Sequence, residues 1–286
     1  MRRSRALGWR QLLRAAGYRL APQLTTAVVS SRARAHSAAL LKEWGLFDLN
    51  QKLIAQAGRR VLHGPFAGMM LTPSAEQQHV GPYLLGTYEI ELHGWVDECL
   101  SRNFEQIVDI GSSFGYYAVG LARHFRETPV VAFDTDWWAR RAVAEMATAN
   151  GLSNITLERS CSASWLARRL KPSSLIVSDC EGFEATLFLG PPIPALTTAT
   201  MIVELHEEIP GELAARFRTR FSATHVIEQI SERAKTPRLR DVPGLDAAQL
   251  ERLSQEVRGP QTWLYLRPRR IGPDNIQPPD SRVEPD

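Results

Sequence analysis

The segment best suited to bind a ligand runs from Ile107 to Ala118 and reads IVDIGSSFGYYA. An apolar run that meets an acid and then two glycines is typical of a buried strand, a tight turn and the start of a helix. Glycine lets the backbone come within contact distance of a ligand, and the first N–H groups of the new helix are unpaired there. Gly111 and Gly115 therefore predict a turn that cradles a ligand.

A second acid, Asp134, ends the next apolar run, Pro129–Phe133. A carboxylate at the end of this second strand can accept both hydroxyls of a ribose. The two strand ends together predict a nucleoside site on a parallel sheet. A nicotinamide dinucleotide site is the nearest alternative, but it expects Gly-x-Gly-x-x-Gly, and Ser113 occupies the middle glycine place.

The elements that must position these residues alternate regularly between strand and helix. Strands are predicted at 105–110, 129–134, 154–158, 174–179, 200–205, 224–230 and 262–267. This alternation predicts a doubly wound α/β fold with a mostly parallel, seven-stranded sheet covered on both faces. Ligands of such sheets lie at the carboxyl ends of the strands. Four acids fall at or just before such ends: Asp109, Asp134, Asp179 and Glu204.

The residues before this core predict a helical N-terminal extension. Residues 37–57 suit a helix that docks on the core, residues 63–69 suit a turn between two short strands, and Pro82 opens a helix that reaches Trp95. The predicted organisation is a basic segment at 1–35, N-terminal helices and a small hairpin at 36–103, the main domain at 104–268 and a disordered tail at 269–286.

The sequence resembles the class I S-adenosylmethionine-dependent methyltransferases, and within them the FkbM-like group. The glycine turn and the acid at the end of the second strand occur there together with a run like Asp-Val-Glu-Gly-x-Glu after the fourth strand. Residues 179–184, Asp-Cys-Glu-Gly-Phe-Glu, match that run with Cys180 in the valine place, and Glu204 and His206 match a Glu and a His around the fifth strand. The resemblance covers residues 86–210 and implies a Rossmann-like methyltransferase fold.

The resemblance also implies which residues hold S-adenosylmethionine. Gly111, Ser112 and Gly115 would pass under its methionine half, and Asp109 and Glu89 would orient its amino group. On the nucleoside side, the ribose would be held at the second strand end, which reads Asp134–Thr135–Asp136 where the family often has Glu-Pro-Asn. Adenine would be contacted near Cys161, which stands where many class I enzymes carry an acid. The residues implied for the cofactor site are Glu89, Asp109, Gly111, Ser112, Gly115, Asp134, Thr135, Cys161 and Asp179.

The implied reaction is transfer of a methyl group to a small-molecule acceptor, and the resemblance favours a hydroxyl of a sugar or another natural product. An oxygen acceptor has to lose its proton, and His206 and Glu181 are the candidates to accept it. Asp179, Glu204 and His206 are of types that could ligate a divalent metal, but their spacing matches no recognised metal signature, so no metal site is predicted. Alternatives are a cofactor-binding protein without methyl transfer, a propylamine transferase, and a membrane-associated enzyme with a lipid-linked acceptor.

The composition sets broad limits. Hydrophobic residues at 44% and charged residues at 23% are ordinary for a soluble globular protein, and a net charge of +3 is too small to predict a nucleic acid partner. Three cysteines without paired spacing predict reduced thiols, and no apolar run approaches the ~20 residues of a membrane span. A cytoplasmic protein is therefore expected.

Residues 1–35 are rich in arginine and contain no acidic residue. Three interpretations of this segment are open: a solvated, partly helical tail, a basic amphipathic segment in weak contact with an anionic membrane surface, and an organelle-targeting peptide.

Overall fold

The computed structural model describes residues 35–77, 79–207, 209–231, 242–256, 258–259 and 261–269. The predicted basic segment before residue 35 and the predicted tail after residue 269 lie outside the described residues, as does most of the predicted loop at 231–244. Within the described part of the chain, no helix is long and apolar enough to cross a membrane.

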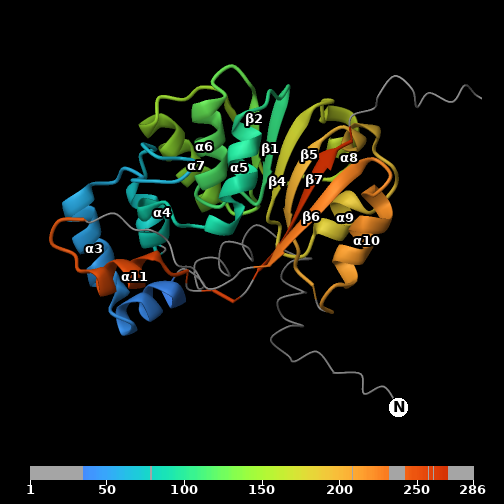
Figure 1. The fold of residues 1–286 in the computed structure, drawn as a ribbon. Coiled ribbons are helices and arrows are strands. Elements are labelled where there is room, and N and C mark those ends of the chain that lie inside the picture. The colour runs from blue at the N-terminus through green and yellow to red at the C-terminus, as the bar shows by residue number, and fades with distance from the viewer. Residues whose placement is uncertain are drawn as a thin grey trace, which may run out of the picture.

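Seven strands form one sheet in the order β3-β2-β1-β4-β5-β7-β6 (Figure 1). The first five strands pair in parallel, whereas β7 is antiparallel to both β5 and β6. The predicted doubly wound, mostly parallel sheet is confirmed, and each strand begins and ends within one residue of its predicted bounds. The strands are β1 (Gln106–Ile110), β2 (Val130–Phe133), β3 (Ile155–Glu158), β4 (Ser174–Ser178), β5 (Thr200–Glu204), β6 (His225–Ser231) and β7 (Thr262–Pro268).

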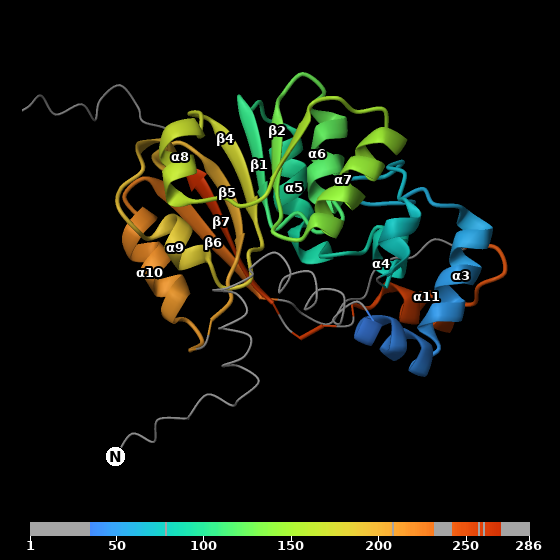
Figure 2. The ribbon, with the colours of Figure 1, turned by 180° about the vertical axis from the view of Figure 1, so that it is seen from behind.

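Helices cover both faces of the sheet, as the views from the front and from behind show (Figures 1 and 2). One face is covered by α5 (His93–Leu100), α6 (Tyr116–His124) and α7 (Trp137–Ala149). The other is covered by α8 (Ala163–Arg169), α9 (Glu184–Phe188) and α10 (Glu212–Phe221). A 3-10 turn, η3 (Pro194–Thr197), leads into β5.

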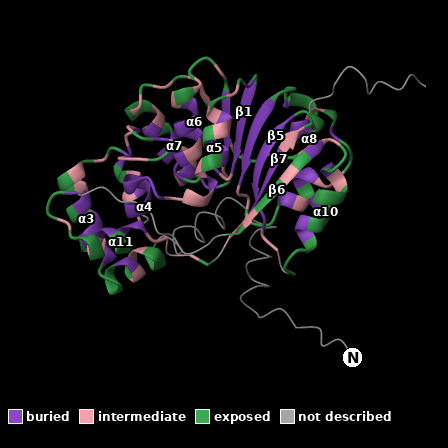
Figure 3. Cartoon of the chain, in the orientation of Figure 1, coloured by how far each residue is buried: buried purple, intermediate pink, exposed green. Residues whose placement is uncertain are grey.

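The central strands are buried throughout, which Figure 3 shows as continuous purple ribbons. Their side chains alternate between the two hydrophobic layers: Ile107 packs on the side of α6, and Val108 on the side of α8. Because both faces are apolar, the sheet leaves only its edges and strand ends for polar chemistry.

The N-terminal extension differs from the predicted helices. The single helix expected over 37–57 is two helices, because Gly45 adopts a left-handed conformation (φ 64°) between helical residues 35–43 and α3 (Leu46–Ala57). The helix expected from Pro82 to Trp95 is also wrong. It is divided into α4 (Gly81–Leu85), a 3-10 turn, η2 (Ile90–Leu92), and α5. The breaks fall at Gly86 (φ 70°) and Glu89 (φ 46°).

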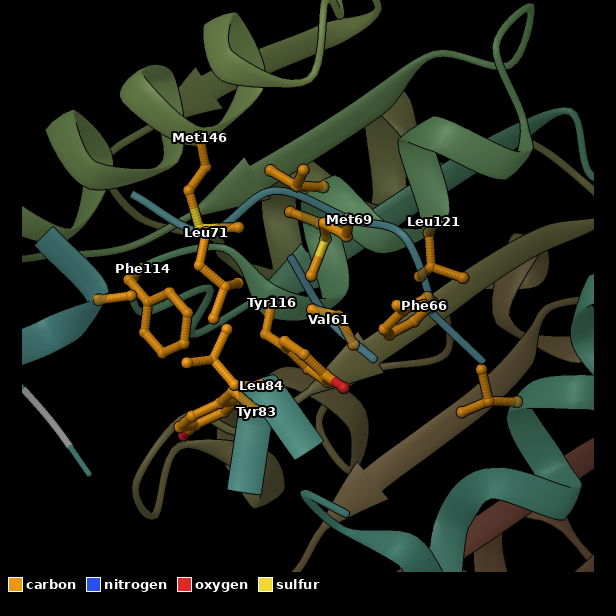
Figure 4. Packing of buried hydrophobic residues seen from close by; sticks show 14 of the residues in the cluster. Val61, Phe66, Met69, Leu71, Tyr83, Leu84, Phe114, Tyr116, Leu121 and Met146 are labelled. Atoms are coloured by element: carbon orange, nitrogen blue, oxygen red, sulfur yellow. The ribbon is translucent and has the colours of Figure 1, made fainter. Parts of the chain in front are cut away.

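The predicted hairpin at 63–69 is reduced to one antiparallel bridge between Arg60 and Met70, followed by the 3-10 turn η1 (Pro73–Gln77). Its apolar side chains dock on α6 and α7, with Phe66 edge-on to Tyr116 at 5.2 Å between ring centroids (Figure 4). A Cβ on Gly120 would lie 2.5 Å from the Phe66 ring, so this glycine in α6 makes room for it. Helices α3, α4 and α11 (Ala247–Ser254) pack together beside this segment.

Candidate functional site

The turn between β1 and α6 takes a conformation that only glycine tolerates at its two ends. Gly111 (φ 89°) and Gly115 (φ 100°) are both left-handed. A Cβ on Gly111 would lie 1.7 Å from the carbonyl oxygen of Asp179. The turn therefore lies directly against the residue that follows β4.

Asp134 is tied to this turn by its carboxylate. One oxygen accepts a hydrogen bond from the backbone N–H of Ser113 (2.9 Å), and the other accepts from the N–H of Asp136 (2.8 Å). Burial raises the pKa of Asp134 to about 6. Thr135 beside it is exposed. The carboxylate is thus held at the end of β2, where a carboxylate that binds the ribose hydroxyls is expected.

Two cavities meet at the glycine turn. One has a volume of about 440 Å³ and the other about 510 Å³, and both are lined by Gly111, Ser113 and Asp179. The larger cavity lies on the side of Asp134 and Cys161. The smaller cavity lies on the side of the α4 aromatics and extends under the helical residues before α3; its polar lining includes Glu89, Asp109, Ser112, Asp179, Glu256 and Arg258.

The smaller cavity contains buried polar atoms that lack hydrogen-bond partners among the described residues. Asp109 is 3% exposed, and one of its carboxylate oxygens has no hydrogen-bond partner among the described residues. Burial raises the pKa of Asp109 to about 8, and the carboxylates of Asp134 and Asp179 act in the same direction. The hydroxyl of Ser112 is likewise buried and unpartnered. Such groups are costly unless a ligand satisfies them.

Glu89 reaches this cavity because of the break after α4. It is 1% exposed, accepts a hydrogen bond from the Tyr117 hydroxyl, and pairs with Arg258, whose Nη2 lies 2.9 Å from Oε1 of Glu89. Burial raises the pKa of Glu89, and Arg258 opposes that rise. Arg258 also pairs with Glu256 (2.6 Å) and lies over the Tyr88 ring.

Arg258 was missed by the sequence analysis. It stands in an irregular segment before the last strand, with no periodicity or motif around it. The only signal in the sequence is a lone arginine followed by glycine, which is not specific. In the folded protein it contacts Glu89, which precedes it by 169 residues in the sequence.

His206 lies among four carboxylates at the ends of β4 and β5. Its Nδ1 is 2.8 Å from Oε1 of Glu184. Its Nε2 lies 3.5–3.6 Å from one oxygen of each of three further acids: Asp179, Glu181 and Glu204. The hydrogen bond with Glu184 is the main cause that raises the pKa of His206 to about 9.

The environment of Glu184 differs from the one that its position in the sequence predicts. As the first residue of α9 it suits a surface acid at a helix start, but it is completely buried. Burial alone would raise its pKa, yet the hydrogen bonds from His206 and from backbone N–H groups lower it below the usual value. Glu184 therefore fixes the orientation of the His206 ring.

Near Cys161 the larger cavity is lined by both apolar and polar residues, among them Arg159. Cys161 lines it together with Trp138 and Leu187, and burial raises the pKa of the Cys161 thiol to about 12. Trp137 instead is exposed and does not line it. The neutral thiol of Cys161 and the apolar side chains of Trp138 and Leu187 are suited to contact an aromatic base.

No known family model matches the sequence, and no curated protein matches it. Among solved structures, the chain is similar to an O-methyltransferase, TomG, of Streptomyces achromogenes, in complex with S-adenosylmethionine (13% identity, TM-score 0.40, covering 59% of this chain and 76% of that one). It is also similar to a precorrin-6y C5,15-methyltransferase of Geobacter metallireducens (12% identity, TM-score 0.41, covering 59% of this chain and 85% of that one). A third similar structure is TYW2 of M. jannaschii, in complex with AdoMet (15% identity, TM-score 0.37, covering 61% of this chain and 74% of that one).

The sheet itself has the strand order 3-2-1-4-5-7-6 with an antiparallel β7, which is the Rossmann-like methyltransferase arrangement. At these identities and TM-scores, the similarity to the three solved structures concerns the fold alone. The narrower resemblance to the FkbM-like group stays a prediction from the sequence.

Proposed function

We propose that this protein is an S-adenosylmethionine-dependent methyltransferase that acts on an oxygen of a small molecule. The observation that carries the proposal is the pair of cavities that meet at Gly111, Ser113 and Asp179. One holds a carboxylate suited to a ribose, and the other holds buried acids and an arginine. This is the pairing that a nucleoside joined to an amino acid needs.

The charges around the turn favour this cofactor over a dinucleotide. Asp109 and Glu89 line the smaller cavity, and Asp179 lies at its border. An ammonium group or a sulfonium favours the ionised form of these buried carboxyl groups, whereas a pyrophosphate would disfavour it further. A nicotinamide dinucleotide is therefore a poor match.

In this proposal, Asp134 binds the ribose hydroxyls and the Cys161 side of the larger cavity takes the adenine. Glu89 and Asp109 face the amino group, and Arg258 faces the carboxylate of the methionine part. Arginine suits a carboxylate because its planar group can donate two parallel hydrogen bonds. A propylamine donor lacks that carboxylate, so Arg258 argues against the propylamine transferase alternative.

S-adenosylmethionine, when bound, supplies a methyl group that is already activated by the sulfonium. The protein has chiefly to hold the acceptor in line and keep water out, and alignment of this sort is worth ~7–11 kcal/mol. Asp179 borders both cavities, so the acceptor is placed beside it, within reach of the His206 cluster. His206, held protonated by Glu184, can accept the acceptor's proton only after its own has been displaced; Glu181, which is exposed beside it, is the alternative acceptor.

The choice of a sugar or natural-product hydroxyl rests on the FkbM-like resemblance of residues 179–184. The alternative of a cofactor-binding protein without methyl transfer makes a different prediction, since it leaves His206 and Glu181 dispensable.

The first experiment is calorimetric titration of the full chain with S-adenosylmethionine and S-adenosylhomocysteine, with NAD as the control ligand. Binding in the micromolar range that is lost in Asp134→Ala supports the proposal. Absence of binding of both ligands to the folded protein overturns it. Methyl transfer to a panel of sugar and polyketide alcohols then separates an enzyme from a binding protein.

A further inference from the structure

The His206 cluster has the geometry of an ion-binding site. Nε2 of His206 lies 3.5 Å from Glu181 Oε2 and 3.6 Å from both Asp179 Oδ1 and Glu204 Oε1. Two ligand atoms that are each about 2.2 Å from an ion, at an angle of 90–110°, lie about 3.1–3.6 Å apart. One ligand atom from each of Asp179, Glu181 and His206 lies within 4.8 Å of the other two.

Glu204 is the second, independent observation. Its side chain is 1% exposed, and neither of its carboxylate oxygens has a hydrogen-bond partner among the described residues. Oδ1 of Asp179 is unpartnered as well. A buried carboxylate without a partner costs several kcal/mol. The single Nε2–H of a protonated His206 cannot donate to three carboxylates, each of which lies beyond hydrogen-bond distance.

Glu184 selects the nitrogen that faces the cluster. It is completely buried, and it receives the hydrogen bond from Nδ1 of His206 at 2.8 Å. Nε2 faces Asp179, Glu181 and Glu204, and a bound cation would displace its proton while Glu184 keeps the proton on Nδ1. A carboxylate behind a histidine in this way is the usual support of a metal-ligating imidazole.

We propose that Asp179, Glu181, Glu204 and Nε2 of His206 bind one divalent cation, for which Mn²⁺ is the best match. Three carboxylates are hard oxygen ligands, and one imidazole nitrogen shifts the preference from Mg²⁺ and Ca²⁺ toward Mn²⁺. Glu181 is 85% exposed and gives the ion a way in from solvent. The spacing of these residues in the sequence does not predict the site, because it forms only where β4 and β5 end side by side.

The ion would lie where Asp179 borders both cavities. There it would bind the oxygen of an acceptor and lower the pKa of its hydroxyl, so that water could take the proton and neither His206 nor Glu181, as ligands of the ion, would have to act as the base. This use of the site rests on the proposed function, but the binding of the ion does not.

The test is titration of the chelator-treated full chain with MnCl₂, followed by calorimetry and by electron paramagnetic resonance, without cofactor or acceptor. We expect one ion per chain and a spin-echo signature of a bound nitrogen that disappears in His206→Gln. Asp179→Asn and Glu181→Gln should abolish stoichiometric binding. Glu184→Gln should weaken it by about 10–100-fold, as for other residues that support a ligand.

Glu212→Gln is the matched control, because it removes an exposed acid of the same type at the start of α10. It should bind Mn²⁺ like the wild type. A substitution of the buried Glu204, such as Glu204→Gln, risks loss of folding. Glu181 is exposed, so Glu181→Gln keeps the test valid without it. Absence of binding by the wild type, or binding that survives in both Asp179→Asn and Glu181→Gln, overturns the proposal. Since no methyl transfer is measured, failure here is distinct from failure of the proposed function.

Discussion

The carbonyl oxygen of Asp179 occupies the space that a side chain on Gly111 would need, at 1.7 Å from the position of its Cβ. The two residues directly follow the neighbouring strands β1 and β4, and the N–H of Asp179 donates to the carbonyl of Ile110 (2.9 Å). The turn at Gly111 and the carboxylates around His206 are therefore joined through Asp179, and a substitution that displaces the turn should also displace Asp179.

Gly111→Ala should destabilise the fold and abolish cofactor binding together. A left-handed non-glycine residue costs about 1–3 kcal/mol, and the displaced carbonyl adds a penalty of about 1–3 kcal/mol. Gly182→Ala is the control, since Gly182 is also left-handed (φ 97°) but has nothing within 4 Å of its Cβ. It should show the strain alone in urea unfolding. Equal losses in the two variants would show that the contact with Asp179 is unimportant.

Arg258→Met should cost about 3–5 kcal/mol of unfolding free energy, because Glu89 is left buried without its cation. The double variant Arg258→Met/Glu89→Gln should recover part of that loss, since Glu89 then carries no charge, and only Glu256 is left without its cation. Arg141→Met is the control: its pair with Glu145 is solvent-exposed and should be worth less than about 1 kcal/mol.

The same Arg258→Met variant should bind S-adenosylmethionine more weakly than the wild type, by calorimetry at a temperature where both are folded. A decarboxylated analogue should lose less affinity on this substitution, because it has no group for Arg258. An equal loss for both ligands would contradict the assignment of Arg258 to the carboxylate.

The sheet could be predicted because its strands are short apolar runs between turns, and local pattern determines them. The turn at Gly111 and the acid at Asp134 could be predicted for the same reason, since each follows directly after a strand. Glu89 was placed in the site only by family resemblance. The sequence around it predicts a helix, whereas Gly86 and Glu89 itself break the chain there.

The partners of the site residues could not be predicted. Arg258 meets Glu89, and Glu184 meets His206, only through the packing of segments far apart in the chain. Nothing local marks a buried glutamate at the start of a short helix as the support of a histidine. The pairing of Glu184 with His206 depends on β4 and β5 lying side by side, which no single sequence pattern specifies.

Asp134 gives a pH dependence of cofactor binding. Its pKa is raised to about 6, so the Asp134 side chain that would bind the ribose is charged above that pH and protonated below it. Affinity for S-adenosylmethionine should therefore fall about tenfold between pH 7 and pH 5. In Asp134→Asn the affinity should be low at both pH values and should fall less between pH 7 and pH 5 than in the wild type; Asp109, whose pKa is also raised, accounts for the fall that remains.

Asp136→Asn is the matched control for this prediction. Asp136 caps α7 by accepting from the N–H of Trp138, and asparagine is an equally good cap. The variant should keep both the affinity and its fall toward pH 5. A wild-type affinity that stays constant from pH 7 to pH 5 would contradict a role of the Asp134 carboxylate.

His79 should make the fold less stable in mild acid. Burial lowers its pKa from 6.5 to about 4, while its Nδ1 lies 3.1 Å from Oδ1 of Asn50. Between these two pH values the unfolded chain binds the proton more readily, so stability contributed by neutral His79 is full above pH 6.5 and is lost as pH falls toward 4. The loss is at most about 3 kcal/mol.

Urea unfolding of the wild type and His79→Gln from pH 7.5 to 4 tests this, because other acids contribute equally to both proteins and cancel in the difference. The free energy of the wild type should fall more steeply than that of the variant below pH 6.5. His124→Gln, at the exposed end of α6, serves as the control and should run parallel to the wild type. Parallel curves for His79→Gln as well would mean that His79 is not held neutral in the fold.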